Sequence, residues 1–89
     1  MHPRVIQVKA EDEFKLRLTF KKGPDRLFDM KPYLSIGVFR ELSDLVKFKA
    51  VRVHLGSIQW PTGQDLCPDT LFEESHPIAK RKRRFKKAA

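Results

Sequence analysis

Residues 60–71 read Trp60-Pro61-Thr62-Gly63-Gln64-Asp65-Leu66-Cys67-Pro68-Asp69-Thr70-Leu71. The two prolines restrict φ, the glycine can adopt a positive φ, and the aspartates can accept hydrogen bonds from nearby backbone N–H groups. So many residues that fix the backbone favour a single path for the chain. The stretch predicts a connection from a β-hairpin to a short closing helix, which begins at Pro68 and ends before His76-Pro77.

The residues before this stretch predict strands. Residues 14–20 alternate strictly between apolar and polar side chains, which is typical of a half-buried antiparallel strand. A strand at residues 5–10 precedes it across an acidic turn, and a strand at residues 26–30 follows it after the turn at residues 22–25. The strand at residues 5–10 is expected to turn one face inward, and this face is formed by Ile6, Val8 and Ala10. Together the three strands predict an antiparallel meander.

A change of element is expected at Pro32, because proline cannot donate to a strand ladder. Spacings of three and four residues then predict an amphipathic helix. Its apolar face is Val38, Phe39, Leu42, Leu45 and Val46. Ser43-Asp44 could break this helix into two short turns. Residues 51–60 alternate on both sides of Gly56-Ser57 and predict a second hairpin. The predicted fold is α+β: a small antiparallel sheet, made of a three-stranded meander plus a second hairpin, with one or two short helices.

The chain has 89 residues, which is enough for one small domain. No run approaches the roughly 18 apolar residues that span a bilayer, and residues 1–9 alternate instead of forming the apolar block of a signal peptide. We therefore expect a cytoplasmic protein without a membrane segment. The single cysteine, Cys67, cannot form an intramolecular disulfide, which is compatible with a reducing compartment.

The net charge of +8 is distributed unevenly. Residues 1–79 hold 12 basic and 11 acidic side chains, whereas residues 80–87 hold the other seven of the 19 Lys and Arg residues. We therefore divide the chain into a nearly neutral domain, residues 1–79, and a basic C-terminal tail, residues 80–89. A block of like charges with only Phe85 to bury is expected to stay disordered unless a polyanion orders it.

Four further motifs precede residues 60–71 along the chain. They are Pro3-Arg4-Val5, Lys31-Pro32-Tyr33-Leu34, Gly37-Val38-Phe39 and Val51-Arg52-Val53. With these motifs in this order, the chain resembles, over about residues 3 to 78, the short prokaryotic family of domains of unknown function numbered 2442. The resemblance implies an α+β domain with a small antiparallel sheet and no established catalytic residues. Some relatives resemble the N-terminal half of helix-turn-helix proteins, and others are suspected partners in toxin–antitoxin gene pairs. Here a basic tail stands in place of a second domain, which argues against a helix-turn-helix role.

Cysteine and histidine invite a catalytic interpretation, since Cys67 with His54 or His76 could supply a nucleophile and a base. Strand alternation places His54 on a polar face, however, and the acidic residues beside Cys67 do not favour a thiolate. We expect a small, buried or half-buried thiol and a protein that is not an enzyme.

Asp65 and Asp69 could act as paired carboxylates, in acid–base chemistry or as ligands of a hard cation. Because aspartates beside glycine and proline usually cap a turn or a helix start, we expect that simpler role. The residues His2, His54, His76 and Cys67 lack the spacing of a zinc site, and the four glycines stand too far apart for a phosphate-binding loop. We expect no metal and no cofactor.

Residues 60–71 also offer a candidate partner surface. Its residues are Trp60, Thr62, Gln64, Asp65 and Asp69. Trp60 and Tyr33 are aromatic anchors of the kind enriched at interfaces, although Trp60 is in phase with Ile58 and packing is the alternative for it. An unprotected sheet edge could accept a strand from another protein or from a second copy, which would give a homodimer.

The tail offers a direct mechanism for binding nucleic acid. Its cations would neutralise phosphates without reading sequence, and its aromatic ring could stack on an unpaired base. The candidate contacts are Lys80, Arg81, Lys82, Arg83, Arg84, Phe85, Lys86 and Lys87. A solvated tail without a partner is the alternative. Two functions are therefore predicted: an antitoxin-like binding module whose protein partner is encoded nearby or, alternatively, a nucleic-acid-associated protein that acts through its tail.

Overall fold

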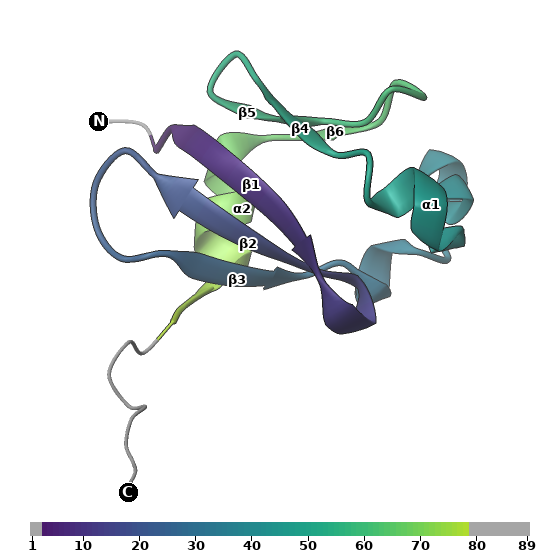
Figure 1. Cartoon of the computed structure of the whole chain (residues 1–89), viewed down its shortest axis with the longest axis horizontal. Helices are drawn as coiled ribbons and strands as arrows, with labels where there is room; N and C mark the ends of the chain where they lie inside the picture. The colour runs from purple at the N-terminus through teal and green to yellow at the C-terminus, as the bar shows by residue number, and fades with distance from the viewer. Residues whose placement is uncertain (1–2, 79–89) are drawn as a thin grey trace, which may run out of the picture.

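The computed structural model describes residues 3–78 and contains two small antiparallel sheets with short helices (Figure 1). The first sheet has the order β1-β2-β3-β7. Its strands are β1 (Val5–Glu11), β2 (Lys15–Phe20), β3 (Arg26–Asp29) and β7 (His76–Pro77). The second sheet has the order β4-β5-β6. Its strands are β4 (Arg52–His54), β5 (Ser57–Gln59) and β6 (Asp65–Leu66). The predicted α+β class, the meander and the second hairpin are confirmed.

Alternation in β2 sets the register of the first sheet. Leu16, Leu18 and Phe20 are buried, and Leu16 lies opposite Phe28 of β3. The strand β7 was not predicted, because it consists of only two residues at the end of the closing helix. The Ile78 N–H donates to the carbonyl oxygen of Asp25 at 2.8 Å, which extends this pairing by one more residue.

The first strand differs from its prediction in phase. The register with β2 shifts between Val5 and Gln7, so Val5 is buried whereas Ile6 is 58% exposed. A β-bulge of this kind places one extra residue on one strand and turns its side chain away from the expected face. The expectation that Ile6 faces inward with Val8 and Ala10 is wrong for Ile6, because alternation alone carries no sign of a bulge.

Short helices fill the connections. They are the 3-10 turns η1 (Asp12–Phe14), η2 (Lys31–Tyr33) and η3 (Gly37–Ser43) and the helices α1 (Leu45–Phe48) and α2 (Pro68–Glu74). The closing helix α2 is confirmed and lies behind the first sheet in Figure 1. Phe14, which was predicted to start β2, instead ends η1 with a positive φ of 57° and packs its ring 5.2 Å from that of Phe48.

The predicted helix over residues 38–46 is broken at Ser43-Asp44, as its sequence allows. Asp44 caps α1, since its carboxylate accepts a hydrogen bond from the Val46 N–H at 3.0 Å. The predicted apolar face is largely wrong: Leu42 is buried, but Val38 and Val46 are 69% and 80% exposed. A 3-10 turn has three residues per turn, and the break at Asp44 redirects the chain, so no single face runs through both pieces.

The second hairpin turns at Leu55-Gly56, one residue earlier than the predicted Gly56-Ser57, because His54 pairs with Ser57. Ile58 and Trp60 are both buried, in the phase the sequence predicts. Within residues 3–78, both sheets and the helices contribute to one hydrophobic core. It consists of Val5, Leu16, Leu18, Phe20, Phe28, Met30, Leu42, Phe48, Ile58, Trp60 and Leu71. No helix among residues 3–78 is long and apolar enough to cross a membrane.

Candidate interaction surface

Trp60 lies in the core, directly after β5. Its side chain has no exposed area, and its indole N–H donates to the carbonyl oxygen of Phe48 at 2.9 Å. The rings of Trp60 and Phe48 lie 6.3 Å apart between centroids. This burial corrects the placement of Trp60 in the partner surface, and its role is packing.

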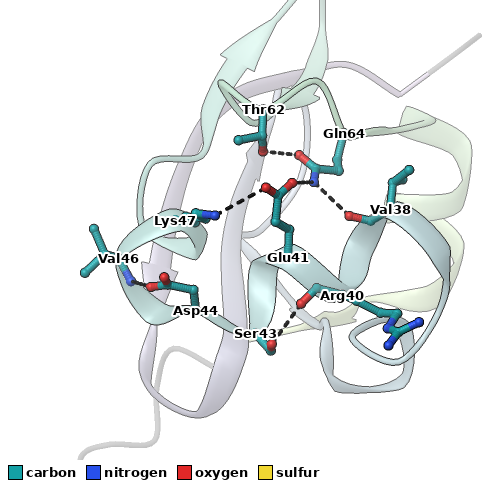
Figure 2. Close-up of polar contacts among 9 residues, drawn as sticks. All are labelled: Val38, Arg40, Glu41, Ser43, Asp44, Val46, Lys47, Thr62 and Gln64. Atoms are coloured by element: carbon teal, nitrogen blue, oxygen red, sulfur yellow. Dashed lines mark hydrogen bonds and ion pairs between the residues drawn. The ribbon is translucent and has the colours of Figure 1, made fainter.

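Gln64 is the other buried member of that predicted surface, with 4% of its area exposed. Its side-chain amide donates to the carbonyl oxygen of Val38 at 2.8 Å and to the carboxylate of Glu41 at 3.2 Å (Figure 2). The Thr62 hydroxyl donates to the Gln64 amide oxygen, and Lys47 pairs with the second Glu41 oxygen at 3.2 Å. Gln64 therefore fastens the turn to η3 and offers little surface to a partner.

The backbone between these two side chains forms a closed turn. The Gly63 N–H donates to the Trp60 carbonyl oxygen at 2.9 Å, and the Trp60 N–H donates to the Gln64 carbonyl oxygen at 2.9 Å. Gly63 has a φ of 105°, which side-chain-bearing residues rarely adopt. Residues 60–64 thus serve as a latch between the second sheet and the preceding helices, and we call them the Trp60–Gln64 latch.

The remaining members of the predicted surface are exposed: Thr62, Asp65 and Asp69. The expected caps are not made, because no hydrogen bond or ion pair among residues 3–78 involves the side chain of Asp65 or Asp69. The N-cap position of α2 is occupied by Cys67, without a side-chain hydrogen bond. Cys67 is exposed, which corrects the expectation of a buried or half-buried thiol.

The residues weighed for catalysis or metal binding lie on separate elements. His54 is exposed on β4 in the second sheet, whereas His76 is exposed on β7 in the first. In the part of the chain that the structure describes, no three His, Cys, Asp or Glu side chains lie together as a metal site would require.

Tyr33 packs between aromatic rings instead of projecting toward a partner. Its ring stacks on Phe28 and meets Phe39 edge-on, in each case with 5.8 Å between centroids. Its hydroxyl donates to the Glu74 carboxylate at 2.5 Å. This hydrogen bond, helped by partial burial and by the negative charge of Glu74, raises the pKa of Tyr33 to about 12.

A shallow cavity of about 380 Å³ opens between β3 and the end of α2. It is lined by Lys15, Leu27, Asp29, Glu74, His76, Pro77 and Ile78. Its carboxylates already have partners, since Glu74 binds the Tyr33 hydroxyl and Asp29 pairs with Lys31 at 3.5 Å.

Several large apolar side chains stay outside the core, and they lie on ordered elements. Leu55 is 82% exposed at the tip of the β4–β5 hairpin, and Ile6 is exposed at the bulge of β1. The Val5 N–H donates to the Gly56 carbonyl oxygen at 2.8 Å, which joins these two places. Neither residue is among the candidate partner-binding residues that the sequence predicts. The feature that could have found Leu55 is a leucine before glycine at a hairpin turn, where asparagine or aspartate is usual.

The comparison with protein families matches residues 5–77 to the family described as protein of unknown function (DUF2442). The chain belongs to the DUF2442 family. No curated protein and no solved structure matches it.

The DUF2442 match runs from the first residue of β1 to the last residue of β7. It therefore includes the Trp60–Gln64 latch and the hairpin that carries Leu55, and it ends before the basic residues at 80–87. The resemblance seen in the sequence motifs is thus confirmed at the level of the family.

Proposed function

We propose that this DUF2442 domain is a non-enzymatic protein-interaction module. The observation that carries the proposal is that the exposed apolar side chains lie on elements fixed by other contacts. The start of β1 is held against the β4–β5 turn by the hydrogen bond from the Val5 N–H to the Gly56 carbonyl oxygen, while Ile6 and Leu55 stay exposed. Apolar side chains that the fold does not need to bury are available to a partner.

The finer form of the proposal is an antitoxin-like role, with a protein partner encoded by a neighbouring gene. It rests on the sequence resemblance to relatives suspected in toxin–antitoxin pairs and on the nearly neutral charge of the domain. A cytoplasmic location belongs to the same proposal. Self-association through a sheet edge stays a prediction.

Co-purification tests this function. The full chain and a chain that ends at Ala79 are each co-expressed with the product of the adjacent gene, and one component is captured through an affinity tag. We expect a stoichiometric complex that survives the deletion, because the described domain provides the contacts. If neither the full chain nor the shortened chain forms a complex, the proposal is contradicted.

The second candidate is nucleic-acid association through the basic tail, whose residues lie outside the described part of the chain. Its support is the seven cations within residues 80–87. The backbone bond from Ile78 to Asp25 also places the last described residue beside the β2–β3 turn, which carries the exposed Lys21 and Lys22. A tail that starts beside further cations could contact a longer run of phosphates.

A further inference from the structure

Leu55 occupies a conformation that its side chain does not favour. It is the first residue of the two-residue β4–β5 turn, with a φ of 51°, and Gly56 follows with a φ of 80°. Positive φ at both positions defines a type I′ turn, in which asparagine, aspartate or glycine is preferred at the first position. Leucine in this region is strained, and with 82% of its surface exposed it gains little from packing. The fold therefore does not account for a leucine at this position.

Ile6 is turned outward by a separate irregularity at the same end of the molecule. The bulge between Val5 and Gln7 leaves Ile6 58% exposed. The hydrogen bond from Val5 to the Gly56 carbonyl oxygen holds the start of β1 against the hairpin turn, and Figure 1 shows the two side by side. Two independent departures from regular structure thus expose two large apolar side chains beside one backbone contact. Strained backbone conformations cluster at active sites, ligand clamps and switch regions, so one on a surface points to a function.

The chain segments that carry these two side chains, and the β2–β3 turn joined to them, hold cations and no carboxylates. The segments 3–10, 20–24 and 50–60 contain no aspartate or glutamate. They carry exposed cations at Arg4, Lys21, Lys22 and Arg52, and none of these four is ion-paired with a carboxylate within residues 3–78. The Lys21 N–H donates to the Arg4 carbonyl oxygen at 2.8 Å. The Arg4 guanidinium packs against Gly56: a Cβ added at Gly56 would lie 2.9 Å from the guanidinium carbon.

The geometry points to Ile6 and Leu55 as the centre of a docking surface for a protein partner whose own contact face is apolar and bordered by aspartate and glutamate. The inference rests on the proposed function and specifies where and by what chemistry the module binds. Two apolar side chains favour a protein partner over a polyphosphate, which would engage the cations and leave the leucine without a contact. A second copy fits poorly, because a symmetric contact would bring like charges together.

Leu55→Asn separates a binding role from a structural one. Asparagine tolerates positive φ at the first position of a type I′ turn, so the thermal unfolding midpoint should stay constant or rise. Binding should fall, because the apolar contact is lost. Ile6→Thr should also weaken binding, while threonine retains a β-branched side chain suited to a strand. Val46→Thr is the matched control, since Val46 is 80% exposed on α1, at the other end of the molecule in Figure 1.

The test measures affinity of the full chain for the purified product of the adjacent gene, by calorimetry at two salt concentrations. We expect binding about tenfold weaker for Leu55→Asn, unchanged for Val46→Thr, and weaker for the wild type at higher salt. A complex that forms equally well with Leu55→Asn would overturn this inference and leave the proposed function standing. The absence of any complex with the wild type would remove both. Leucine-dependent binding to duplex DNA or to phosphatidylglycerol vesicles, in place of the protein, would overturn the assignment of a protein partner.

Discussion

The indole N–H of Trp60 donates to the backbone carbonyl oxygen of Phe48, 12 positions earlier in the chain, and both side chains are completely buried. The bond links the strand end after β5 to the last residue of α1. Apart from it, the Phe48 carbonyl oxygen accepts, among residues 3–78, only a longer hydrogen bond from the Val51 N–H at 3.4 Å. A buried carbonyl that loses its main donor is costly, so this pair is expected to be one of the more important polar contacts in the domain.

Trp60→Phe should lower the free energy of unfolding by about 2–3 kcal/mol, because it removes the donor and part of the ring volume. Urea unfolding followed by circular dichroism provides the measurement. Ile58→Val is the control: it also removes buried volume, at a residue with 1% exposure, but breaks no side-chain hydrogen bond, and it should cost about 1 kcal/mol. Equal losses for the two variants would show that the indole bond contributes nothing beyond packing.

Exchanging the functional groups of Gln64 and Glu41 should destabilise the fold less than Gln64→Glu alone. Gln64→Glu places a nearly buried carboxylate against the Val38 carbonyl oxygen and the Glu41 carboxylate, which should cost about 2–3 kcal/mol at neutral pH. Adding Glu41→Gln removes the repulsion and supplies a new amide donor. The double variant should therefore recover about 1 kcal/mol, measured in a double-mutant cycle of urea unfolding. Strict additivity of the two single changes would contradict a direct contact.

Tyr33 permits a titration that reports one residue, because it is the only tyrosine in the chain. Its hydroxyl donates to Glu74, and its pKa is raised to about 12 from an ordinary value of 10.0. A raised pKa means that the protonated form is favoured in the folded state. The resulting stabilisation is fully present below about pH 10 and is lost as the pH rises toward 12. Tyrosinate absorbance should show this late titration.

Glu74→Gln is the matched variant for that titration. It keeps an acceptor oxygen for the hydrogen bond, which is the main cause of the shift, but removes the negative charge, so the pKa of Tyr33 should move only part of the way back toward its ordinary value. The unfolded chain in urea gives the reference titration. An unchanged titration in Glu74→Gln would mean that the carboxylate charge does not govern the ionisation of Tyr33.

The sequence allowed the meander, the second hairpin and the closing helix to be predicted, because strict alternation and strong turn residues fix them locally. It did not reveal β6 or β7, since two-residue strands carry no periodic pattern. The prediction of one apolar face over residues 38–46 was wrong, because it assumes the 3.6-residue period of a continuous α-helix. A 3-10 turn and the Asp44 cap interrupt that period. The sequence drew attention to Trp60 and Gln64, and both have a structural role as buried hydrogen-bond donors. The exposure of Leu55 and Ile6 depends on the exact positions of the β4–β5 turn and of the bulge in β1, which the sequence did not predict.

The last prediction concerns the binding of duplex DNA by the basic tail. If its seven cations neutralise phosphates on duplex DNA, the logarithm of the binding constant should fall with the logarithm of salt concentration with a slope on the order of −6. Fluorescence anisotropy with duplexes of unrelated sequence measures this slope, and sequence should have little effect because phosphates carry no base identity. A chain that ends at Ala79 should lose the binding, and Lys21→Gln with Lys22→Gln in the full chain should reduce the slope by about 2 if the β2–β3 turn takes part. A truncated chain that binds as strongly as the full chain would locate the DNA contacts in the folded domain and contradict the role of the tail.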